Sequence, residues 1–346
     1  MSFKHIVKGF SRVLKNRRIY LDYSAGTPVL PEVLRAMKPF WSKKFYNPNG
    51  IYAESVEVSR EVAKFRRQIA ELLNVAEESV IFTSGGAEAN VLAVRGVGEG
   101  QVVAEPESHS TVTEAILPST SSEVKLISSL VANNKLGRQL REERRVSGSK
   151  YPLLHVDASQ SAQYYNVGLE TLACDLLTLD SAKMYGPKGI GALVVKRGVT
   201  LNLPPLGTPA VPLIAGFAKA FEIVSKDHEA EFTRLSKLSN EFAKQVSTRI
   251  KSAVVTQTLP NVINISVPGI LPELLVLALD RVGVMVSAGP ACSSNKPEPE
   301  ETPVRFSLGR QTSRKELNQA LERLCQVVEN LHLDINKTVD NLIFKD

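Results

Sequence analysis

Short apolar runs alternate with helical stretches along most of the chain. The runs contain few charged residues and cover residues 79–83, 101–105, 123–130, 152–159, 175–180 and 191–197. Such strands are typical of a parallel sheet that is buried on both faces, with helices as its crossover connections. The pattern therefore predicts an α/β fold with a mostly parallel central sheet flanked by helices.

The stretches between the runs place apolar residues at helical spacing. Residues 31–45 and 55–74 predict two amphipathic helices. Beyond about residue 222 the chain changes to a long charged helix at 228–250, an alternating strand at 261–267 and helices at 271–280 and 316–332. These elements predict a large α/β domain over residues 19–221 and a smaller α+β domain over residues 222–346.

The first 18 residues form a basic segment. They contain no acidic residue, and apolar residues recur at helical spacing at Phe3, Ile6, Val7, Phe10, Val13 and Leu14. This predicts a cationic amphipathic helix. Such a helix suits an anionic membrane surface or an organelle-targeting segment. A terminal helix that packs on the body or on a partner subunit is the commoner arrangement, and we favour it.

The composition narrows the class of protein. Of the 346 residues, 43% are hydrophobic and 23% are charged, which is ordinary for a globular chain with a sizeable core. Three cysteines without a CxxC pair argue against a disulfide scaffold or a zinc ribbon and favour a cytoplasmic location. Since no apolar run reaches the length of a membrane span, we expect a soluble protein without a transmembrane segment.

The net charge of +6 does not identify a nucleic-acid partner, because Lys and Arg are mixed with Asp and Glu along the chain. The most charged interior stretch, residues 135–150, contains an arginine cluster but no aromatic residue that stacks on bases. We therefore expect a solvated loop or helix face there, and no direct contact with nucleic acid.

A glycine-rich turn contains the most informative residue, Lys183. It lies in the segment SAKMYGPKGIG, directly after an apolar run that ends in Asp180. A lysine in such a turn can form a Schiff base with a pyridoxal cofactor, although lysines in surface loops are common. A second turn leads from an apolar strand into a helix at Gly86 and directs backbone N–H groups toward an anion such as a cofactor phosphate.

Three polar residues follow predicted strands. Asp157 and Gln160 come at the end of the run at 152–159, and His109 follows the run at 101–105. Ligands bind at this edge of α/β sheets, where Asp157 can keep a pyridine nitrogen protonated and Gln160 can donate a hydrogen bond to a ring oxygen. His109 can stack on such a ring and transfer protons. Each residue also has an ordinary interpretation, Asp157 as a helix cap and His109 as a loop residue.

Cys292 and Arg305 are two further candidates. Cys292 lies in a loop of small residues, prolines and acids, where a thiol is accessible. Cys174 and Cys325 occupy apolar positions, which favours structural roles. Arg305, in a predicted strand, can bind a substrate carboxylate through two hydrogen bonds or form a structural ion pair.

Together and in this order, these segments resemble the NifS-like cysteine desulfurases, within the class V aminotransferase group of fold type I pyridoxal-phosphate enzymes. The similar stretches are IYLDYSAGTPVLPEVLRAM, FTSGGAEANVLAV, VANNKLG, HVDASQSA, SAKMYGPKGIGALVVKR, GTPAVPLIAGFAKA, VSAGPACSS and VRFSLGR, which span about residues 19 to 330. The resemblance implies a fold type I enzyme that binds pyridoxal 5'-phosphate.

The resemblance implies roles for the residues around the cofactor ring. Lys183 matches the Schiff-base lysine, and His109 matches the acid/base that stacks on the ring. Asp157 matches the partner of the ring nitrogen, while Gln160 and Asn134 match the contacts to the ring oxygen.

The resemblance also implies a phosphate site. Its contacts match the backbone N–H groups of Gly86 and Ala87, the hydroxyl of Ser181 and the side chain of Thr208. In this family the threonine at the position of Thr208 reaches the cofactor of the other subunit, so a homodimer is implied.

The implied activity is removal of sulfur from L-cysteine, which gives L-alanine and a persulfide on Cys292. Arg305 matches the arginine that binds the substrate carboxylate, with Asn134 as a second contact. The sulfur would pass to an acceptor protein for iron–sulfur cluster assembly or tRNA thiolation. Two alternatives remain open: a related lyase or transaminase of the selenocysteine lyase type, and a cofactor-poor scaffold paralogue.

The chain departs from the family's pattern at the phosphate site. Ala87 replaces a threonine, Asp180 a serine and Ala182 a histidine. Because a carboxylate repels a phosphate dianion, we expect weaker cofactor binding than is typical of the family.

The loop that carries the reactive thiol is short. Only twelve residues separate Cys292 from Arg305, and the stretch before Gly207 is also shortened. A short loop restricts the reach of the thiol, which predicts dependence on a dedicated acceptor protein.

Overall fold

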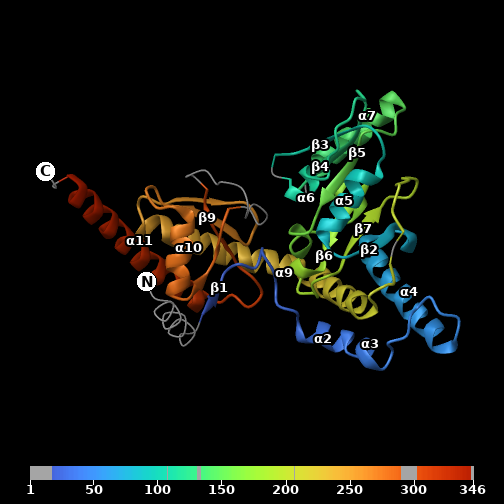
Figure 1. The fold of residues 1–346 in the computed structure, drawn as a ribbon, viewed down its shortest axis with the longest axis horizontal. Helices are drawn as coiled ribbons and strands as arrows, with labels where there is room; N and C mark the ends of the chain where they lie inside the picture. Colours follow the sequence, from blue (N-terminus) through green and yellow to red (C-terminus); the bar gives the residue numbers. More distant parts are fainter. Residues whose placement is uncertain (1–17, 107, 131–133, 206, 290–301, 344–346) are drawn as a thin grey trace. The chain divides into compact units, whose positions relative to one another are not determined.

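The computed structural model describes residues 18–106, 108–130, 134–205, 207–289 and 302–343, without the side chains of residues 134, 135 and 334–343. Cys292 and the predicted basic helix before Arg18 lie outside this description. The chain forms two compact units, shown in Figure 1: a larger unit, Thr27–Glu229, and a smaller unit made of the segment up to Gly26 and the residues from Ala230 onward. The domain limits expected from the sequence, 19–221 and 222–346, stay predictions.

A six-stranded sheet forms the centre of the larger unit. Its strands, in spatial order, are β2 (Val80–Thr83), β7 (Gly191–Val195), β6 (Leu176–Asp180), β5 (Leu153–Asp157), β4 (Val124–Ser129) and β3 (Gln101–Ala104). Neighbours from β3 to β6 pair in parallel, whereas β7 is antiparallel to both β6 and β2. The predicted mostly parallel sheet is confirmed.

Helices connect and flank these strands (Figure 1). They are α2 (Pro31–Met37), α3 (Pro39–Ser42), α4 (Ala53–Leu73), α5 (Gly86–Gly96), α6 (Ser110–Thr113), α7 (Asn134–Ser147), α8 (Leu169–Leu172) and the 3-10 helices η1 (Glu77–Ser79), η2 (Ser161–Gln163) and η3 (Ser181–Lys183). The long helix α9 (Val211–Arg249) begins in the larger unit and continues into the smaller one.

One predicted helix is divided in two. The stretch 31–45 has helical periodicity, but α2 ends at Met37 and α3 begins at Pro39. Pro39 has no N–H to donate to a carbonyl in the preceding turn, which interrupts the helical hydrogen bonds, and a proline is well tolerated in the first turn of a new helix.

The core of the larger unit lies between α5 and the sheet. The buried α5 residues Ala89, Leu92 and Ala93 belong to one cluster with Leu126, Leu153, Leu176 and Leu193 of four strands. Each fully buried leucine contributes roughly 1.5–3 kcal/mol. This packing holds the first turn of α5, at Gly86, against the carboxyl ends of the central strands.

The smaller unit combines two sheets with helices. Its strands are β1 (Ile19–Tyr20), which pairs in parallel with β10 (Val284–Met285), and the antiparallel set β11 (Ser287–Ala288), β12 (Val304–Ser307), β9 (Val262–Ser266) and β8 (Val254–Gln257). Its helices are α10 (Pro272–Arg281), α11 (Arg314–Ile343) and the second part of α9. The predicted smaller α+β domain is confirmed as a fold class.

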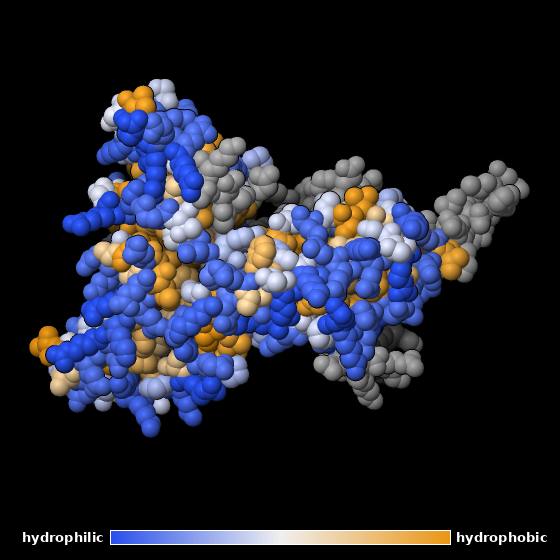
Figure 2. Space-filling model, turned by 180° about the vertical axis from the view of Figure 1, so that it is seen from behind, coloured by the Kyte–Doolittle hydropathy of each residue, from blue (hydrophilic) through white to orange (hydrophobic). Residues whose placement is uncertain are grey.

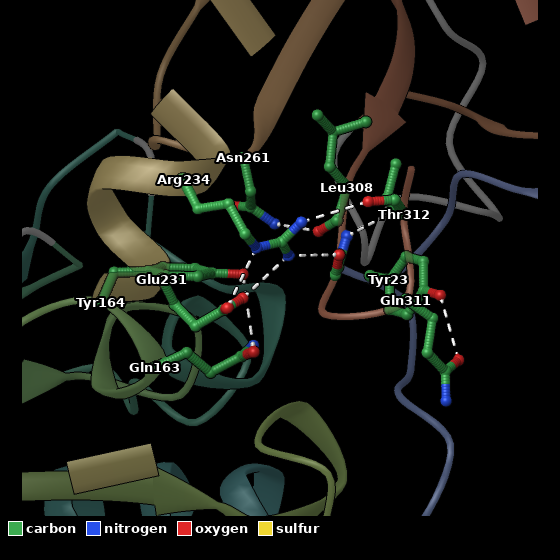
Figure 3. A network of polar contacts seen from close by, with 10 residues as sticks. Tyr23, Gln163, Tyr164, Glu231, Arg234, Asn261, Leu308, Gln311 and Thr312 are labelled. Carbon is green, nitrogen blue, oxygen red and sulfur yellow. Dashed lines mark hydrogen bonds and ion pairs between the residues drawn. The ribbon is translucent and has the colours of Figure 1, made fainter. Parts of the chain in front are cut away.

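Arg234 fixes the loop that follows β12, as Figure 3 shows. Its guanidinium forms two hydrogen bonds to Glu231, at 3.0 and 2.9 Å, and donates to the backbone carbonyls of Gly309 and Thr312. Asn261 donates to the carbonyl of Leu308 at 2.9 Å. The Arg234 guanidinium and the Asn261 amide therefore donate to backbone carbonyls of this loop and hold the end of β12 in place.

In the part of the chain that the structure describes, no helix combines the length and the apolar character needed to cross a bilayer.

Gly191→Ala is expected to lower the free energy of unfolding by about 1–3 kcal/mol. A Cβ atom at Gly191 would lie 2.5 Å from the carbonyl oxygen of Leu179 and 2.8 Å from the carbonyl carbon of Gly85, so β6 or the turn before α5 must move. Urea unfolding measures the effect. Gly207→Ala is the control, since a Cβ there meets no atom within 4 Å. Equal stability of Gly191→Ala and wild type contradicts the prediction.

Candidate active site

A buried carboxylate, Asp157, ends β5. It is 4% exposed and each of its oxygens has one donor: the side-chain amide of Asn90 at 2.8 Å and the backbone N–H of Ser159 at 2.9 Å. The Asn90 amide also donates to the hydroxyl of Thr111 at 3.1 Å. The carboxylate is therefore fixed in position by α5 and by the turn after its own strand.

A histidine that the sequence interpretation did not select, His155, lies two residues before Asp157 within β5. Its Nδ1 is 2.8 Å from the Ser128 hydroxyl and its Nε2 is 2.9 Å from the Thr178 hydroxyl, so it links β4, β5 and β6. Burial lowers the pKa of His155 to about 4 and outweighs the opposite effect of Asp157. The ring is neutral at physiological pH and supports the strand ends through hydrogen bonds.

His109 caps the short helix α6. Its Nδ1 accepts a hydrogen bond from the backbone N–H of Thr111 at 3.1 Å and lies 2.7 Å from the hydroxyl of the same residue. Burial lowers the pKa of His109; Asp157 and Asp180 oppose this effect, and Lys183 adds to it. The imidazole is thus neutral, and because Nδ1 accepts, the proton lies on Nε2.

Lys183 ends η3 in the turn after β6 and is half-buried. The Thr27 hydroxyl donates to the carbonyl of Ala182 at 2.9 Å and accepts the backbone N–H of Tyr185 at 2.7 Å. At Gly186 a Cβ would lie 2.0 Å from the Ser181 hydroxyl, so only glycine fits there. The turn is rigid and brings the lysine near His109 and Asp180, whose pKa values it lowers.

Asp180 occupies the space between the end of β6 and the start of α5. Its carboxylate accepts the backbone N–H of Ala182 at 2.9 Å, and its other oxygen would lie 3.3 Å from a Cβ at Gly86. Burial raises the pKa of Asp180, while the backbone N–H groups of Ala182 and Gly86 and the charge of Lys183 lower it. A Cβ at Gly86 would lie 3.1 Å from the Cβ of Asp180, so the absence of a side chain permits this approach.

Several buried hydroxyl groups surround these residues without a hydrogen-bond partner in the described structure. They belong to Ser159, Ser161 and Ser181, and each residue is at most 9% exposed. Since buried polar groups are normally paired, these hydroxyls are available to a ligand.

The remaining predicted residues of the larger unit lie at its edges. Gln160 is half-buried, and Ala87, in the first turn of α5, is exposed. Thr208 lines a cavity of about 420 Å³ together with Ser84 and Glu88. The backbone of Asn134 begins α7, whereas its side chain lies outside the described structure, as does the whole of Cys292.

Arg305 belongs to β12 of the smaller unit. It is 6% exposed, and its guanidinium donates to Asp22 at 3.1 Å and to the carbonyl of Gly289 at 3.4 Å. Asp22 also accepts a hydrogen bond from Ser287 at 2.7 Å. Within the described residues, the Nε of Arg305 has no partner. The sequence left open a carboxylate-binding arginine or a structural ion pair, and the structure contains an ion pair with Asp22.

Among the described residues no group of three or more His, Cys, Asp or Glu side chains is arranged to hold a metal ion.

The stability of the protein is expected to fall as the pH decreases from 6.5 toward 4. The unfolded chain takes up a proton on His155 near pH 6.5, whereas the folded chain does so only near pH 4, so acid favours unfolding in this window. The contribution is on the order of 3 kcal/mol. Urea unfolding across this pH range measures it, and a His155→Gln variant should give a flatter profile. A variant with the wild-type profile contradicts the assignment.

Comparison with known proteins identifies the family. The sequence matches the Aminotransferase class-V family over residues 19–119, 101–207 and 206–320. It is 30% identical to "Cysteine desulfurase IscS" of Dictyoglomus turgidum, over 91% of this chain and 95% of that protein. It is 28% identical to "Cysteine desulfurase, mitosomal" of Encephalitozoon cuniculi, over 91% of this chain and 88% of that protein.

Solved structures support the same fold. A structure named "NIFS-LIKE PROTEIN" superposes with a TM-score of 0.80 at 23% identity and covers 90% of this chain and 100% of its own. A NifS-like protein from Rickettsia africae gives a TM-score of 0.78 at 20% identity, with the same coverage. The motifs that the sequence shares with this family lie at the carboxyl ends of the central strands. The chain belongs to the aminotransferase class-V family.

Proposed function

We propose that this chain is a cysteine desulfurase that uses pyridoxal 5'-phosphate to remove sulfur from L-cysteine. The similarity to proteins named cysteine desulfurase along 91% of the chain carries the proposal. The local geometry supports it, because Lys183, Asp157 and His109 lie around the carboxyl ends of β5 and β6, where α/β proteins bind ligands.

The side chains fit the ring of the cofactor. Asp157 is buried and oriented by Asn90 and Ser159, as a carboxylate must be to keep a ring nitrogen protonated. Gln160 follows on the same turn and would contact the ring oxygen, with Asn134 as a second contact. The unpartnered hydroxyls of Ser159 and Ser181 offer donors to an incoming group.

The fit is poorer on the phosphate side. The sequence resemblance implies phosphate contacts at Gly86, Ala87, Ser181 and Thr208, yet the Asp180 carboxylate lies against Gly86, with an oxygen 3.3 Å from the position of a Cβ there. The anion site therefore contains the chain's own carboxylate.

The residues divide the proton transfers between them. Pyridoxal phosphate, when bound, supplies an electron sink for the charge left on the substrate's α-carbon. We assign to Lys183 the removal of the α-proton. His109, neutral and protonated on Nε2, is suited to give a proton to the substrate and to recover it later.

The thiol chemistry is assigned to Cys292. The chain has three cysteines, and a thiol must become a thiolate to attack sulfur. Burial raises the pKa of Cys174 to about 12 and also raises that of Cys325. Neither residue is suited to attack near neutral pH, which supports the placement of Cys292 in that role.

The proposed reaction balances without an oxidant. The thiolate of Cys292 attacks the sulfur of the substrate, so that a sulfur–sulfur bond forms while the substrate's carbon–sulfur bond breaks. The electron pair of the broken bond stays with carbon, which is protonated to give L-alanine. The products are alanine and a persulfide on Cys292, whose outer sulfur then passes to an acceptor protein for iron–sulfur cluster assembly or tRNA thiolation.

Arg305 is the proposed site for the substrate carboxylate, on the basis of the sequence resemblance. Its ion pair with Asp22 reduces the net positive charge available to an incoming carboxylate. We therefore expect Arg305 to bind the substrate carboxylate through its unpaired Nε and through the N–H groups that also donate to Asp22.

Lys183→Ala is expected to lower alanine formation from L-cysteine by roughly 100- to 10,000-fold, because the residue that moves the α-proton is removed. Alanine is measured by chromatography and sulfide by colorimetry after addition of pyridoxal phosphate. Lys188→Ala, an exposed lysine of the same turn, is the control and should keep wild-type rates.

A second pair of variants tests the thiol. Cys292→Ala should abolish persulfide and sulfide formation, while Cys325→Ala should retain both. If the wild-type protein gives no alanine and no sulfide with cofactor present, the proposed activity is wrong and the scaffold alternative is favoured. If Cys292→Ala releases sulfide at the wild-type rate, the persulfide step is wrong.

We further propose a homodimer, in which Thr208 contacts the phosphate of the cofactor bound to the partner subunit. Large hydrophobic side chains are exposed in one segment of the larger unit: Leu34, Trp41, Phe45, Ile51 and Tyr52. Phe45 stacks on Tyr46 with ring centroids 4.5 Å apart. Figure 2 shows hydrophobic residues exposed among hydrophilic ones on one face of the molecule. An exposed apolar cluster of this kind is suited to a protein interface.

The cytoplasmic location stays a prediction. One relative with a similar sequence is named as mitosomal.

The proposed dimer has a direct test. Sedimentation equilibrium is expected to give twice the chain mass of 37.8 kDa. A single-chain mass at the concentration used for the activity assay contradicts the dimer and the role of Thr208 with it.

A further inference from the structure

The chain supplies its own anion to the first turn of α5. In this turn the Asp180 carboxylate lies against Gly86, where a Cβ would be 3.3 Å from one of its oxygens, and it accepts the N–H of Ala182 at 2.9 Å. The free N–H groups and the helix dipole make the start of a helix favourable for one negative charge, and here that charge is a side chain.

A second observation points to a ligand at the same place. The hydroxyl of Ser159 is buried without a partner among the described residues, and it would lie 2.8 Å from a Cβ at Gly86. The Ser181 hydroxyl, next to Asp180, is also buried and unpaired. The start of α5 therefore has two hydroxyl donors for an anion, and beside them lies a carboxylate that accepts a backbone N–H.

We propose that Asp180 occupies the anion position at the start of α5 and competes there with the cofactor's phosphate, so that this chain gains little affinity from the phosphate group. This inference rests on the proposed function. It predicts that the ring, through Lys183, Asp157 and Gln160, provides most of the binding, and that pyridoxal without a phosphate binds almost as well.

The competition depends on the charge of Asp180. Burial raises the pKa of Asp180. The charge of Lys183 lowers this pKa and that of Asp157 raises it, and Asp180 in turn raises the pKa of His109. As the pH falls, protonation of Asp180 removes the repulsion. Anion binding should then become stronger, and this effect should be absent when the carboxylate is replaced by an amide.

The test compares the wild type with Asp180→Ser, Asp180→Asn and Glu88→Gln. Asp180→Asn keeps an acceptor for the N–H of Ala182, so it preserves the turn if the serine variant folds poorly. Glu88→Gln is the matched control, because Glu88 lies in the same helical turn but accepts the N–H of Ser84. Circular dichroism verifies that each variant is folded.

The first measurement is the affinity for pyridoxal and for pyridoxal phosphate, by absorbance titration of the apo protein. In the wild type and in Glu88→Gln the two affinities should be similar. In Asp180→Ser the phosphate should improve affinity by about 10- to 100-fold, with Asp180→Asn between. If the wild type prefers pyridoxal phosphate by that factor and Asp180→Ser does not change it, the inference is wrong.

The second measurement uses sulfate alone and is independent of the proposed activity. Sulfate should raise the melting temperature of Asp180→Ser and leave the wild type unchanged near pH 8, and it should begin to protect the wild type as acidification protonates Asp180. Equal protection of both proteins near pH 8 overturns the inference. If no variant binds pyridoxal, the proposed function fails, while the sulfate result still decides the role of Asp180.

Discussion

The contact between the end of β6 and the start of α5 is the constraint on which the site depends. The Asp180 side chain lies against Gly86, and Gly86 lacks the Cβ that would be 3.1 Å from the Cβ of Asp180 and hinder this approach. Gly191 on β7 passes equally close to the turn before α5. Because these backbone segments pack so tightly, α5 can present Asn90 to Asp157, and the turn after β6 can place Lys183 among the acids.

The protonation states around this contact follow from burial. His109 and His155 both have lowered pKa values because they are removed from water, so the histidines remain neutral while the acids retain backbone or amide donors. A neutral His109 with its proton on Nε2 can give a proton, and the Asp157 side chain, held by Asn90 and Ser159, can accept a hydrogen bond from a ligand nitrogen. Because Asp180 is also buried, its negative charge repels an approaching phosphate more strongly than it would in water.

Much of this fold and site follows from local sequence patterns. The apolar runs predicted the strands of the central sheet, and the residues at their carboxyl ends include Lys183 and Asp157. Contacts between distant segments were not predictable from the sequence. His155 lies within a buried strand, and nothing in the sequence indicated its hydrogen bonds to the neighbouring strands. The ion pair of Arg305 with Asp22 joins positions far apart in the chain. The aspartate at position 180 was visible in the sequence, but its close approach to Gly86 is a property of the packed turn.

The most direct test of the central claim is a crystal structure of the wild-type protein with pyridoxal phosphate. We expect the Asp180 carboxylate to remain against Gly86, with the cofactor ring beside Asp157 and its phosphate outside the first turn of α5. Phosphate oxygens on the N–H groups of Gly86 and Ala87, with Asp180 turned away, would contradict the account.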